Sequence, residues 1–468
     1  MVKNNPIVKN DDYILGISCF YHNAAACLIK NGEIIAASEE ERFTRKKNDK
    51  RFPSLAINYC LEEAKIHTEE LKAIVYYDNT SLTLERIVKS NLYVGLKGKD
   101  SFSYFLEPWL YTKLKLPQII RRNLKYDGKI LQNLHHRSHA ASAFYPSPFN
   151  EAAILTIDGV GEWSTATIAE GNGNRITMHK EMRFPHSLGL LYSTFTQFIG
   201  FKVNSGEYKM MGLAPYGKPK YVNMIFDNII NLNHDGSLKL NLDYFDFLHK
   251  PSMYSSHFEK LFDGPARDPE SNINQRELDI ARSIQVITEE VVLKMANYAH
   301  KVTKMKNLCL AGGVALNCVA NGRLLKEGPF ENVWVQPAAG DSGGALGAAY
   351  DVYFSLFDKN NPKKRSSSCL QKSSLLGPEY NRDEVKSFLE TYGCTYKKLK
   401  KSERSHILSE ILIEGKVLGH FSGRMEFGPR ALGNRSILGD ARDKKTQVTL
   451  NKKIKYRESF RPFAPSVL

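Results

Sequence analysis

Two histidines and one aspartate form the clearest candidate site in the sequence. His135 and His139 are four residues apart, and Asp158 ends an apolar run and precedes a glycine. On a helix, residues i and i+4 share one face, so two imidazoles and a nearby carboxylate are predicted to bind a divalent metal of intermediate softness. Two partly buried histidines that bond backbone groups are the alternative, which the spacing and the Asp-Gly turn disfavour. His136 points about 100° away around the helix and is free to bond elsewhere.

Two glycine turns, at residues 311–317 and 340–344, each join a predicted strand to a predicted helix. Glycine lets backbone N–H groups approach an anion, and a helix N-terminus favours negative charge. Neither turn is a P-loop, because no Gly-Lys-Ser/Thr follows, and close helix–strand packing also explains such glycines. Two turns of this kind in one α/β body favour a nucleotide site. Asp341 could then be a fourth metal ligand, a ribose or water contact, or a helix N-cap.

Three further segments carry candidate charged groups. Glu207 and Lys209 lie among glycines, where Lys209 could meet a phosphate, although an ordinary solvated loop fits equally well. His22 lies in a polar break after the first apolar run and could act as a general base for a hydroxyl or bond its own turn. The C-terminal region carries cations that could bind phosphate or carboxylate: Arg424, Arg430, Arg435, Lys455, Arg457 and Arg461.

Length and composition predict a multidomain globular protein. The chain has 468 residues, of which 42% are hydrophobic and 25% charged, so two or three domains are expected. No apolar run approaches the length of a bilayer span, and the polar N-terminus has no signal-peptide core. Seven scattered cysteines without a CxxC pair favour a reducing cytoplasm and argue against a zinc–cysteine site.

The net charge of +15 is concentrated near the C-terminus. Residues 415–468 carry twelve Lys/Arg and four Asp/Glu, which is more than half of the excess. Such a run is usually a solvated face. Because these arginines are interleaved with glycine and aromatic residues, we favour an anion-binding pocket.

The elements that position these residues repeat along the chain. Residues 13–20 are predicted to form a strand and residues 24–38 a hairpin with an Asn-Gly turn. Residues 152–178 repeat this pattern about 140 residues later, which indicates a duplicated α/β unit with a ligand site between its halves. Helices are expected over 53–64, within 80–125, over 187–199 and over 276–302, and further strands begin near 307 and 333.

We predict a large N-terminal body at residues 1–360, divided into units of roughly 1–150 and 151–360, a linker at 361–373, and a C-terminal α/β piece at 374–468. Residues 460–468 are expected to enter a strand. We expect the C-terminal piece to be a partial, truncated domain, because small α/β domains usually have on the order of 100–150 residues.

The run Gly423–Leu438, GRMEFGPRALGNRSIL, resembles the signature of the NodU-type O-carbamoyltransferases, which include nodulation carbamoyltransferases and tobramycin carbamoyltransferase. The resemblance covers essentially the whole chain, with further motifs at residues 22–26, 38–42, 45–47, 135–143, 206–217 and 312–317 and at Asp341. It implies an actin-like ATPase (ASKHA) fold for the N-terminal body, similar to the tRNA threonylcarbamoyl-transfer protein, and a YrdC/Sua5-like C-terminal domain.

The resemblance also implies a reaction. The C-terminal domain would make carbamoyl-adenylate from carbamoyl phosphate and ATP, and the N-terminal body would transfer the carbamoyl group to a hydroxyl of a sugar-containing molecule or polysaccharide precursor. A divalent metal, Fe(II) in the best-known relative, would be held by His135, His139, Asp158 and Asp341, and Mg²⁺ could accompany ATP. His22 and Lys209 would be catalytic. Contacts to nucleotide and carbamoyl phosphate would come from Glu207, Gly312, Gly313, Asn317, Gly340, Ser342, Arg424, Arg430, Arg435, Lys455, Arg457 and Arg461.

Two alternatives stay open. One is a threonylcarbamoyl-transfer-like protein that acts on tRNA, which a basic surface would suit but which lacks the 423–438 signature. The other is a catalytically incomplete homologue. The HxxxH spacing is not that of a metalloprotease, because the glutamate of HExxH is absent. We expect a small-molecule or glycan acceptor as partner, no nucleic acid and no membrane span; a homodimer stays open.

Overall fold

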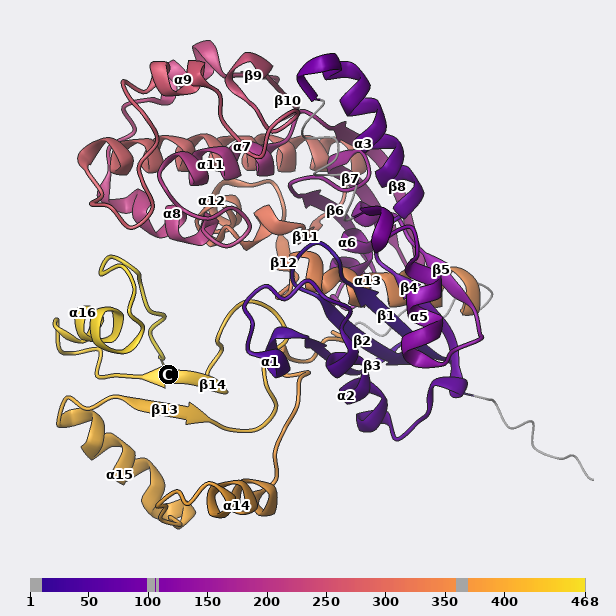
Figure 1. Cartoon of the computed structure of the whole chain (residues 1–468), viewed down its shortest axis with the longest axis vertical. Coiled ribbons are helices and arrows are strands. Elements are labelled where there is room, and N and C mark those ends of the chain that lie inside the picture. Colours follow the sequence, from indigo (N-terminus) through magenta and orange to yellow (C-terminus); the bar gives the residue numbers. More distant parts are fainter. Residues whose placement is uncertain (1–10, 99–105, 107–108, 359–368, 468) are drawn as a thin grey trace, which may run out of the picture.

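The chain folds into a mixed α/β structure around two five-stranded sheets, in a computed structural model that describes residues 11–98, 106, 109–358 and 369–467 (Figure 1). The strand order is β3-β2-β1-β4-β5 in the first sheet and β8-β7-β6-β11-β12 in the second. The strands are β1 (Tyr13–Ser18), β2 (Ala25–Lys30), β3 (Glu33–Glu39), β4 (Leu71–Tyr76), β5 (Ile130–Gln132), β6 (Glu151–Ile157), β7 (Ser164–Asn172), β8 (Arg175–Arg183), β11 (Asn307–Ala311) and β12 (Asn332–Val335).

The two sheets share one topology. In each, the first three strands form an antiparallel meander, and the first strand also pairs in parallel with the fourth, which pairs in parallel with the fifth. The turn between β2 and β3 has positive φ at both Asn31 (52°) and Gly32 (84°), as a type I′ hairpin turn requires. The repeated strand order agrees with the predicted duplication of an α/β unit.

Two helices lie between the sheets, and each covers the sheet of the other half. α6 (His135–Phe144) follows β5 but packs on β6, β7 and β11, whereas α13 (Asp341–Val352) follows β12 but packs on β1, β2 and β4. The two helices also pack against each other. On the outer faces, α2 (Ser54–Ala64) covers β2 and β3, and α11 (Gln275–Thr303) covers β6 and β7.

Glycines bring these middle layers into backbone contact. A Cβ atom on Gly347 of α13 would lie 1.7 Å from the Ser138 carbonyl oxygen of α6, and one on Gly16 of β1 would lie 1.9 Å from the Ala345 carbonyl oxygen of α13. Real Cβ contacts essentially never fall below 3.0 Å. The approach of α13 to both α6 and the first sheet therefore depends on the absence of side chains at these two positions.

The second sheet separates two apolar cores. Ala152 and Ile154 of β6 pack with the first sheet, α6 and α13. Ala153, Leu155 and Ile157 alternate with them and pack with α7 (Leu188–Phe198) and α11 on the opposite face. This alternation follows from the two-residue period of a strand, and it makes β6 a strand that is buried on both faces.

The remaining helices and strands of the N-terminal body surround this framework. Asn79 caps α3, because its side chain accepts hydrogen bonds from the Ser81 and Leu82 amides. The elements are α1 (Glu41–Thr44), α3 (Thr80–Val94), α5 (Leu116–Leu124), α8 (Glu207–Leu213), α9 (Val222–Asn228), β9 (Ile230–Leu232), β10 (Leu238–Leu240), α10 (Ser256–Leu261) and α12 (Cys318–Glu327). None of the helices in the described ranges combines the length and apolar character that a bilayer span requires.

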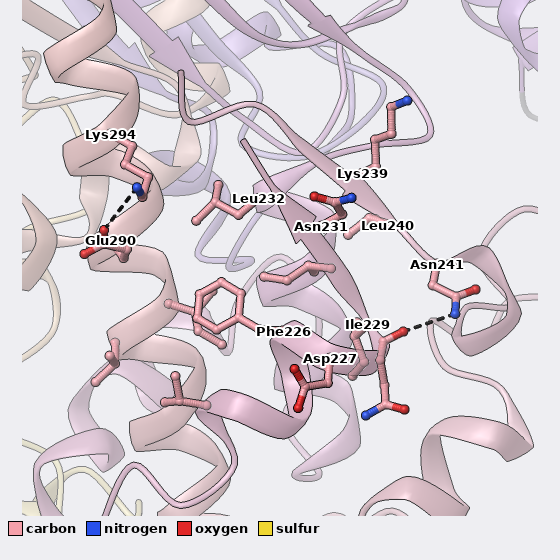
Figure 2. A pocket seen from close by; sticks show the side chains of 15 residues that line it. Phe226, Asp227, Ile229, Asn231, Leu232, Lys239, Leu240, Asn241, Glu290 and Lys294 are labelled. Atoms are coloured by element: carbon pink, nitrogen blue, oxygen red, sulfur yellow. Dashed lines mark hydrogen bonds and ion pairs between the residues drawn. The ribbon is translucent and has the colours of Figure 1, made fainter. Parts of the chain in front are cut away.

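One open hollow of about 890 Å³ lies between α9, the β9–β10 hairpin and α11 (Figure 2). Its wall mixes apolar side chains such as Phe226 and Leu240 with the ion pair of Lys294 and Glu290. The hollow contains none of the candidate site residues.

The C-terminal piece lies to one side of the two sheets (yellow in Figure 1). It contains α14 (Arg382–Thr391), α15 (Lys401–Ile413), β13 (Leu418–Phe421), β14 (Arg435–Leu438) and α16 (Thr446–Thr449), and the two strands pair antiparallel. Neither α14 nor α15 has a buried residue. Met425 and Phe427 are buried, and Phe427 belongs to the core of the first sheet. The YrdC-like character of this piece stays a prediction.

Two local expectations are wrong, and one lies outside the described residues. The sequence predicts that residues 460–468 enter a strand, but residues 461–467 have no regular secondary structure. The segment around Lys209 is not a loop, because Glu207–Leu213 forms α8, which ends in a short turn at Ala214–Tyr216. Residues 361–368 of the predicted linker lie outside the described residues.

Candidate metal centre

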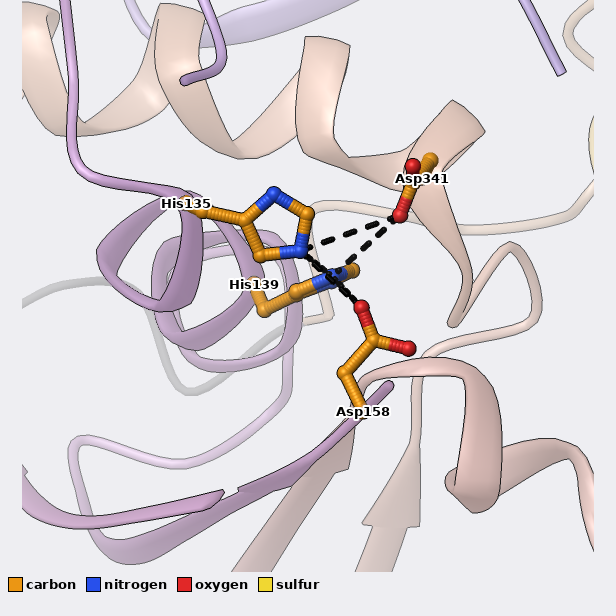
Figure 3. Close-up of side chains that lie close together, drawn as sticks. All are labelled: His135, His139, Asp158 and Asp341. Atoms are coloured by element: carbon orange, nitrogen blue, oxygen red, sulfur yellow. Dashed lines mark hydrogen bonds and ion pairs between the residues drawn. The ribbon is translucent and has the colours of Figure 1, made fainter. Parts of the chain in front are cut away.

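Four side chains from three elements converge between the two sheets (Figure 3). His135 and His139 lie one turn apart on α6, Asp158 follows the end of β6, and Asp341 is the first residue of α13. Their ligand atoms all lie within 4.8 Å of one another. Because α6 and α13 each cross to the sheet of the other half, Asp341 lies beside histidines that precede it by about 200 residues.

The distances within this cluster suit a shared cation. His135 Nε2 lies 2.9 Å from Asp158 Oδ2 and 3.1 Å from His139 Nε2. His139 Nε2 lies 3.3 Å from Asp158 Oδ2, and the two Nε2 atoms lie 3.8 and 3.7 Å from Asp341 Oδ1. Donors that each lie about 2.0–2.2 Å from one ion are separated by such distances. The two imidazoles and two carboxylates therefore fit a divalent metal ion, with positions left for other ligands.

The electrostatics of the cluster show the same complementarity. Burial lowers the pKa of His135, but the hydrogen bond with Asp158 and the charges of Asp341, Asp158 and Asp78 outweigh it and raise this pKa to about 9. For Asp158, burial raises the pKa, and the two histidines more than offset that effect, so the carboxylate stays ionised. His136 is different: burial and the two neighbouring histidines lower its pKa, and its Nδ1 bonds Thr156 Oγ1 at 2.6 Å.

His22 lies next to the cluster. Its Nε2 is 3.6 Å from Asp341 Oδ2, and its Nδ1 is 2.8 Å from Asn23 Oδ1. An amide oxygen only accepts hydrogen bonds, so this contact puts the proton on Nδ1 and leaves Nε2 able to accept another. On the same carboxylate, the Tyr77 hydroxyl donates to Asp341 Oδ2 at 3.2 Å. Sequence reasoning missed Tyr77, whose position directly after β4, at the end of a buried strand, was the available signal.

The first glycine turn touches the metal cluster directly. The Gly313 amide donates to Asp158 Oδ1 at 3.0 Å, opposite the oxygen that faces the histidines. Gly312 has a φ of +90°, and a Cβ there would lie 2.2 Å from the Ile157 carbonyl oxygen. Asn317 is engaged within the protein, where its side chain bonds Gln285 and caps α12 through the Ala320 amide. In the second turn, Gly340 precedes α13 and Ser342 is buried in its first turn.

Glu162 anchors the helix that carries the histidines. The residue at the N-cap of α6, Leu134, offers no capping side chain. Instead, the Glu162 carboxylate accepts hydrogen bonds from the His135 amide (2.9 Å) and the Asn79 amide (2.7 Å), so that it joins the starts of α6 and α3. Burial raises the pKa of Glu162 to about 7, and nearby Asp78 adds to the shift. Sequence reasoning missed this residue, although it lies in the glycine-rich turn after Asp158.

The predicted residues of α8 lie apart from the metal cluster. Glu207 binds the loop before its own helix, because its carboxylate accepts from Ser193 Oγ and from the Asn204 and Gly206 amides. Lys209 Nζ lies 2.7 Å from Glu458 Oε1, which ties α8 to the C-terminal segment.

The C-terminal cations separate into two sets. Arg424 and Arg430 bond backbone carbonyls: Arg424 reaches Ile35, Leu376 and Gly377 and the Tyr59 hydroxyl, and Arg430 reaches Leu316. The other four, Arg435, Lys455, Arg457 and Arg461, form a basic cluster. Burial is the first cause that lowers the pKa values of Arg435, Lys455 and Arg457, and neighbouring cations lower them further. Arg461 also lies over the Tyr208 ring of α8, 4.5 Å from its centre.

Comparison with known proteins identifies matches over most of the sequence. Residues 13–350 match the family model described as Carbamoyltransferase N-terminus, and residues 409–468 match Carbamoyltransferase C-terminus. The uncharacterized protein sll1178 of Synechocystis is 51% identical over 97% of this chain and 75% of its own length. Nodulation protein NolNO of Sinorhizobium fredii is 34% identical over 96% of this chain and 63% of its own length.

The chain thus spans less than two thirds of the length of NolNO, and it spans 58% of nodulation protein NolO of Bradyrhizobium diazoefficiens, to which it is 35% identical over 71% of the chain. Among solved structures, component A of the (R)-2-hydroxyglutaryl-CoA dehydratase of Acidaminococcus fermentans aligns with 72% of this chain and 96% of its own. The TM-score is 0.39 at 17% identity, which does not establish a shared fold.

Proposed function

The chain belongs to the carbamoyltransferase family, and we propose that it transfers a carbamoyl group from carbamoyl-adenylate to a hydroxyl of a sugar-containing acceptor. The observation that carries the proposal is the convergence of a candidate general base, His22, on a cluster of two imidazoles and two carboxylates beside a glycine turn. This combination offers a proton acceptor and a metal-binding set beside a glycine turn within one small region.

The transfer step follows from these groups. The acceptor oxygen attacks the carbamoyl carbon while its proton passes to His22 Nε2, and the bond from that carbon to the phosphate oxygen of AMP breaks. AMP leaves as an anion, and the acceptor keeps the carbamoyl group as an ester. Asp341, 3.6 Å from His22 Nε2, favours the imidazolium that forms, and the hydrogen bond to Asn23 holds the ring in the tautomer that accepts at Nε2.

His135, His139, Asp158 and Asp341 would hold the metal, for which we propose Fe(II) because imidazole and carboxylate ligands with open positions suit it. When bound, such an ion supplies Lewis-acid stabilisation of phosphate and carbonyl oxygens. Asp158 contacts both the histidines and the Gly313 amide, so the chain couples the metal ligands to the turn that we propose for the nucleotide.

We assign the formation of carbamoyl-adenylate from carbamoyl phosphate and ATP to the C-terminal region. The basic cluster of Arg435, Lys455, Arg457 and Arg461 suits polyanionic substrates. Lys209 lies at the edge of this cluster, where it is paired with Glu458. We propose that Lys209 contacts a phosphate when this ion pair breaks. Arg424 and Arg430 already bond carbonyl groups, so we expect them to hold the signature motif in place.

A paired measurement tests the proposal. The full chain is incubated with Fe(II), ATP, carbamoyl phosphate and a panel of sugars. Pyrophosphate, which adenylation releases, and carbamoylated sugar are quantified separately by mass spectrometry. We expect both products from the wild type. His22→Asn should lose transfer by about 10²–10⁴-fold and still release pyrophosphate. His406→Asn, whose side chain is 76% exposed on α15, is the matched control and should behave as the wild type.

The outcomes separate the alternatives. Pyrophosphate without any carbamoylated sugar would contradict the sugar acceptor, and the absence of both products would favour the catalytically incomplete homologue. Transfer that survives in His22→Asn would contradict the role of His22 as the base.

A further inference from the structure

Arg86 on α3 has a guanidinium without an ionic partner among the described residues. Its Nε atom is buried and has no hydrogen-bond partner, and within the described ranges no ion pair involves its guanidinium. The side chain lies over the Phe184 ring, 5.1 Å from its centre. A guanidinium with a buried, unpartnered Nε carries a desolvation cost, because that N–H group would be bonded in water. Such a group is prepared for an external anion.

The carboxylates near Arg86 are committed elsewhere. Asp78 binds Lys113 Nζ at 2.8 Å and the Thr83 hydroxyl at 3.0 Å. Glu162 accepts from the amides that begin α3 and α6. Burial lowers the pKa of Arg86, and the charges of Asp78 and Glu162 oppose this shift through space. Neither therefore neutralises Arg86 by contact.

Phe184, whose ring lies under Arg86, begins the loop after β8. The Phe184 amide donates to the Trp163 carbonyl oxygen at 2.8 Å, so the loop after β8 is joined to the loop that follows Asp158. The Trp163 ring lies under Arg183, 5.2 Å from the guanidinium carbon. Flat aromatic faces next to a guanidinium suit a sugar ring that carries an oxyanion.

Tyr21 lies beside His22. The two rings are neighbours, with centres 4.6 Å apart. Tyr21 is 48% exposed, so this pair of rings is open to an incoming acceptor. Glu162 joins the start of α3, the helix that carries Arg86, to the start of α6, the helix that carries His135 and His139, so Arg86 and the metal cluster belong to one region. The glycine turn at Gly313 contacts the other oxygen of Asp158.

We propose that Arg86, with Phe184, forms an acceptor subsite that binds an oxyanion of the sugar which receives the carbamoyl group. This inference rests on the proposed function and specifies its acceptor as an anionic sugar. The guanidinium of Arg86 binds a carboxylate or a phosphate near the reacting hydroxyl. The fork of Arg86 would make the bidentate contact that either group accepts.

Direct binding to the full chain tests this inference separately from turnover. Isothermal titration is performed with methyl glucoside, methyl glucuronide and glucose 1-phosphate, which are respectively neutral, carboxylated and phosphorylated. We expect at least one anionic sugar to bind about tenfold more tightly than the neutral one, as a charge-assisted contact provides. Arg86→Gln should abolish this preference and leave the affinity for the neutral sugar unchanged. Comparing the two anions identifies the group that Arg86 binds.

Arg121→Gln is the matched control, because it removes the same charge from the partly exposed side chain on α5 and should keep the preference. Equal binding of all three sugars to the wild type, no binding of any, or a preference that survives Arg86→Gln would each overturn the subsite. If anionic sugars bind as expected but receive no carbamoyl group, the transfer reaction fails while the subsite stands.

Discussion

Replacement of Gly347 by alanine should weaken both the fold and the metal centre. The new Cβ would lie 1.7 Å from the Ser138 carbonyl oxygen, whereas real contacts essentially never fall below 3.0 Å. α13 and α6 must then separate by about 1.3 Å or more at this point. The atoms nearest to this Cβ are backbone atoms of α6, so no side chain can rotate away to make room for it. Overpacking of this kind typically costs about 1–3 kcal/mol, and sometimes more.

The same displacement acts on the metal ligands. Asp341 begins α13, and His135 and His139 lie on α6, so a shift between the helices separates ligands that tolerate errors of only about 0.2 Å. We expect a loss of metal affinity of about 10–100-fold, the range found when groups that position ligands are altered. Isothermal titration with Fe(II) under anaerobic conditions and thermal unfolding measure the two effects.

Gly322→Ala provides the control. Gly322 lies within α12, and a Cβ added there would meet no atom within 4 Å, so alanine at this position should stabilise the helix by about 0.5–1 kcal/mol. If Gly347→Ala unfolds at the wild-type temperature and binds metal with wild-type affinity, the close contact of α6 and α13 does not position the site.

Three further experiments test single contacts. Tyr77→Phe removes the hydrogen bond to Asp341 and should lower metal affinity by about tenfold; unchanged affinity in a metal titration would contradict this role. Glu162 has a pKa raised to about 7, so its contribution to stability is full below about pH 4.3, its ordinary pKa, and declines as the pH rises through 7. Glu162→Gln should therefore remove this decline, which urea unfolding at pH 5 and pH 8 measures against the wild type. A double-mutant cycle of Lys209→Ala and Glu458→Ala should give a coupling of about 0.5–1 kcal/mol, and additive effects would show that the pair does not hold the C-terminal segment.

Local patterns are sufficient to predict the elements that carry the site. The Asn-Gly turn and the alternation of the flanking residues predict the β2–β3 hairpin, and the four-residue spacing places His135 and His139 on one face of a helix. Asp341 is a candidate ligand because it follows a strand and a glycine turn. These signals depend on short-range periodicity and turn chemistry, which a single sequence contains.

Contacts between distant segments are not predictable in this way. Glu162 caps a helix that begins 27 residues earlier, and Tyr77 reaches Asp341 across 264 residues. Nothing in the local pattern of either residue specifies its partner. The alternative of a solvated loop around Lys209 is wrong, because residues 207–213 form the short helix α8. The strand predicted over residues 460–468 is also wrong: residues 461–467 have no regular secondary structure, and a local pattern does not specify the partner that a strand must pair with. Arg424 bonds the carbonyl groups of Ile35, 389 residues away, and of Leu376, 48 residues away. Its residue type alone suggests a phosphate ligand instead.

Because α6 and α13 each cover the sheet of the other half, the first sheet cannot be covered soon after it is synthesised on the ribosome. β1 and β2 emerge within the first 30 residues, but the helix that covers their inner face begins only at residue 341. Until then, that apolar face of the nascent sheet has no native cover from its own chain. Native packing of this sheet therefore requires more than 300 further residues to be synthesised after β2, and its exposed apolar face is open to a chaperone during that interval.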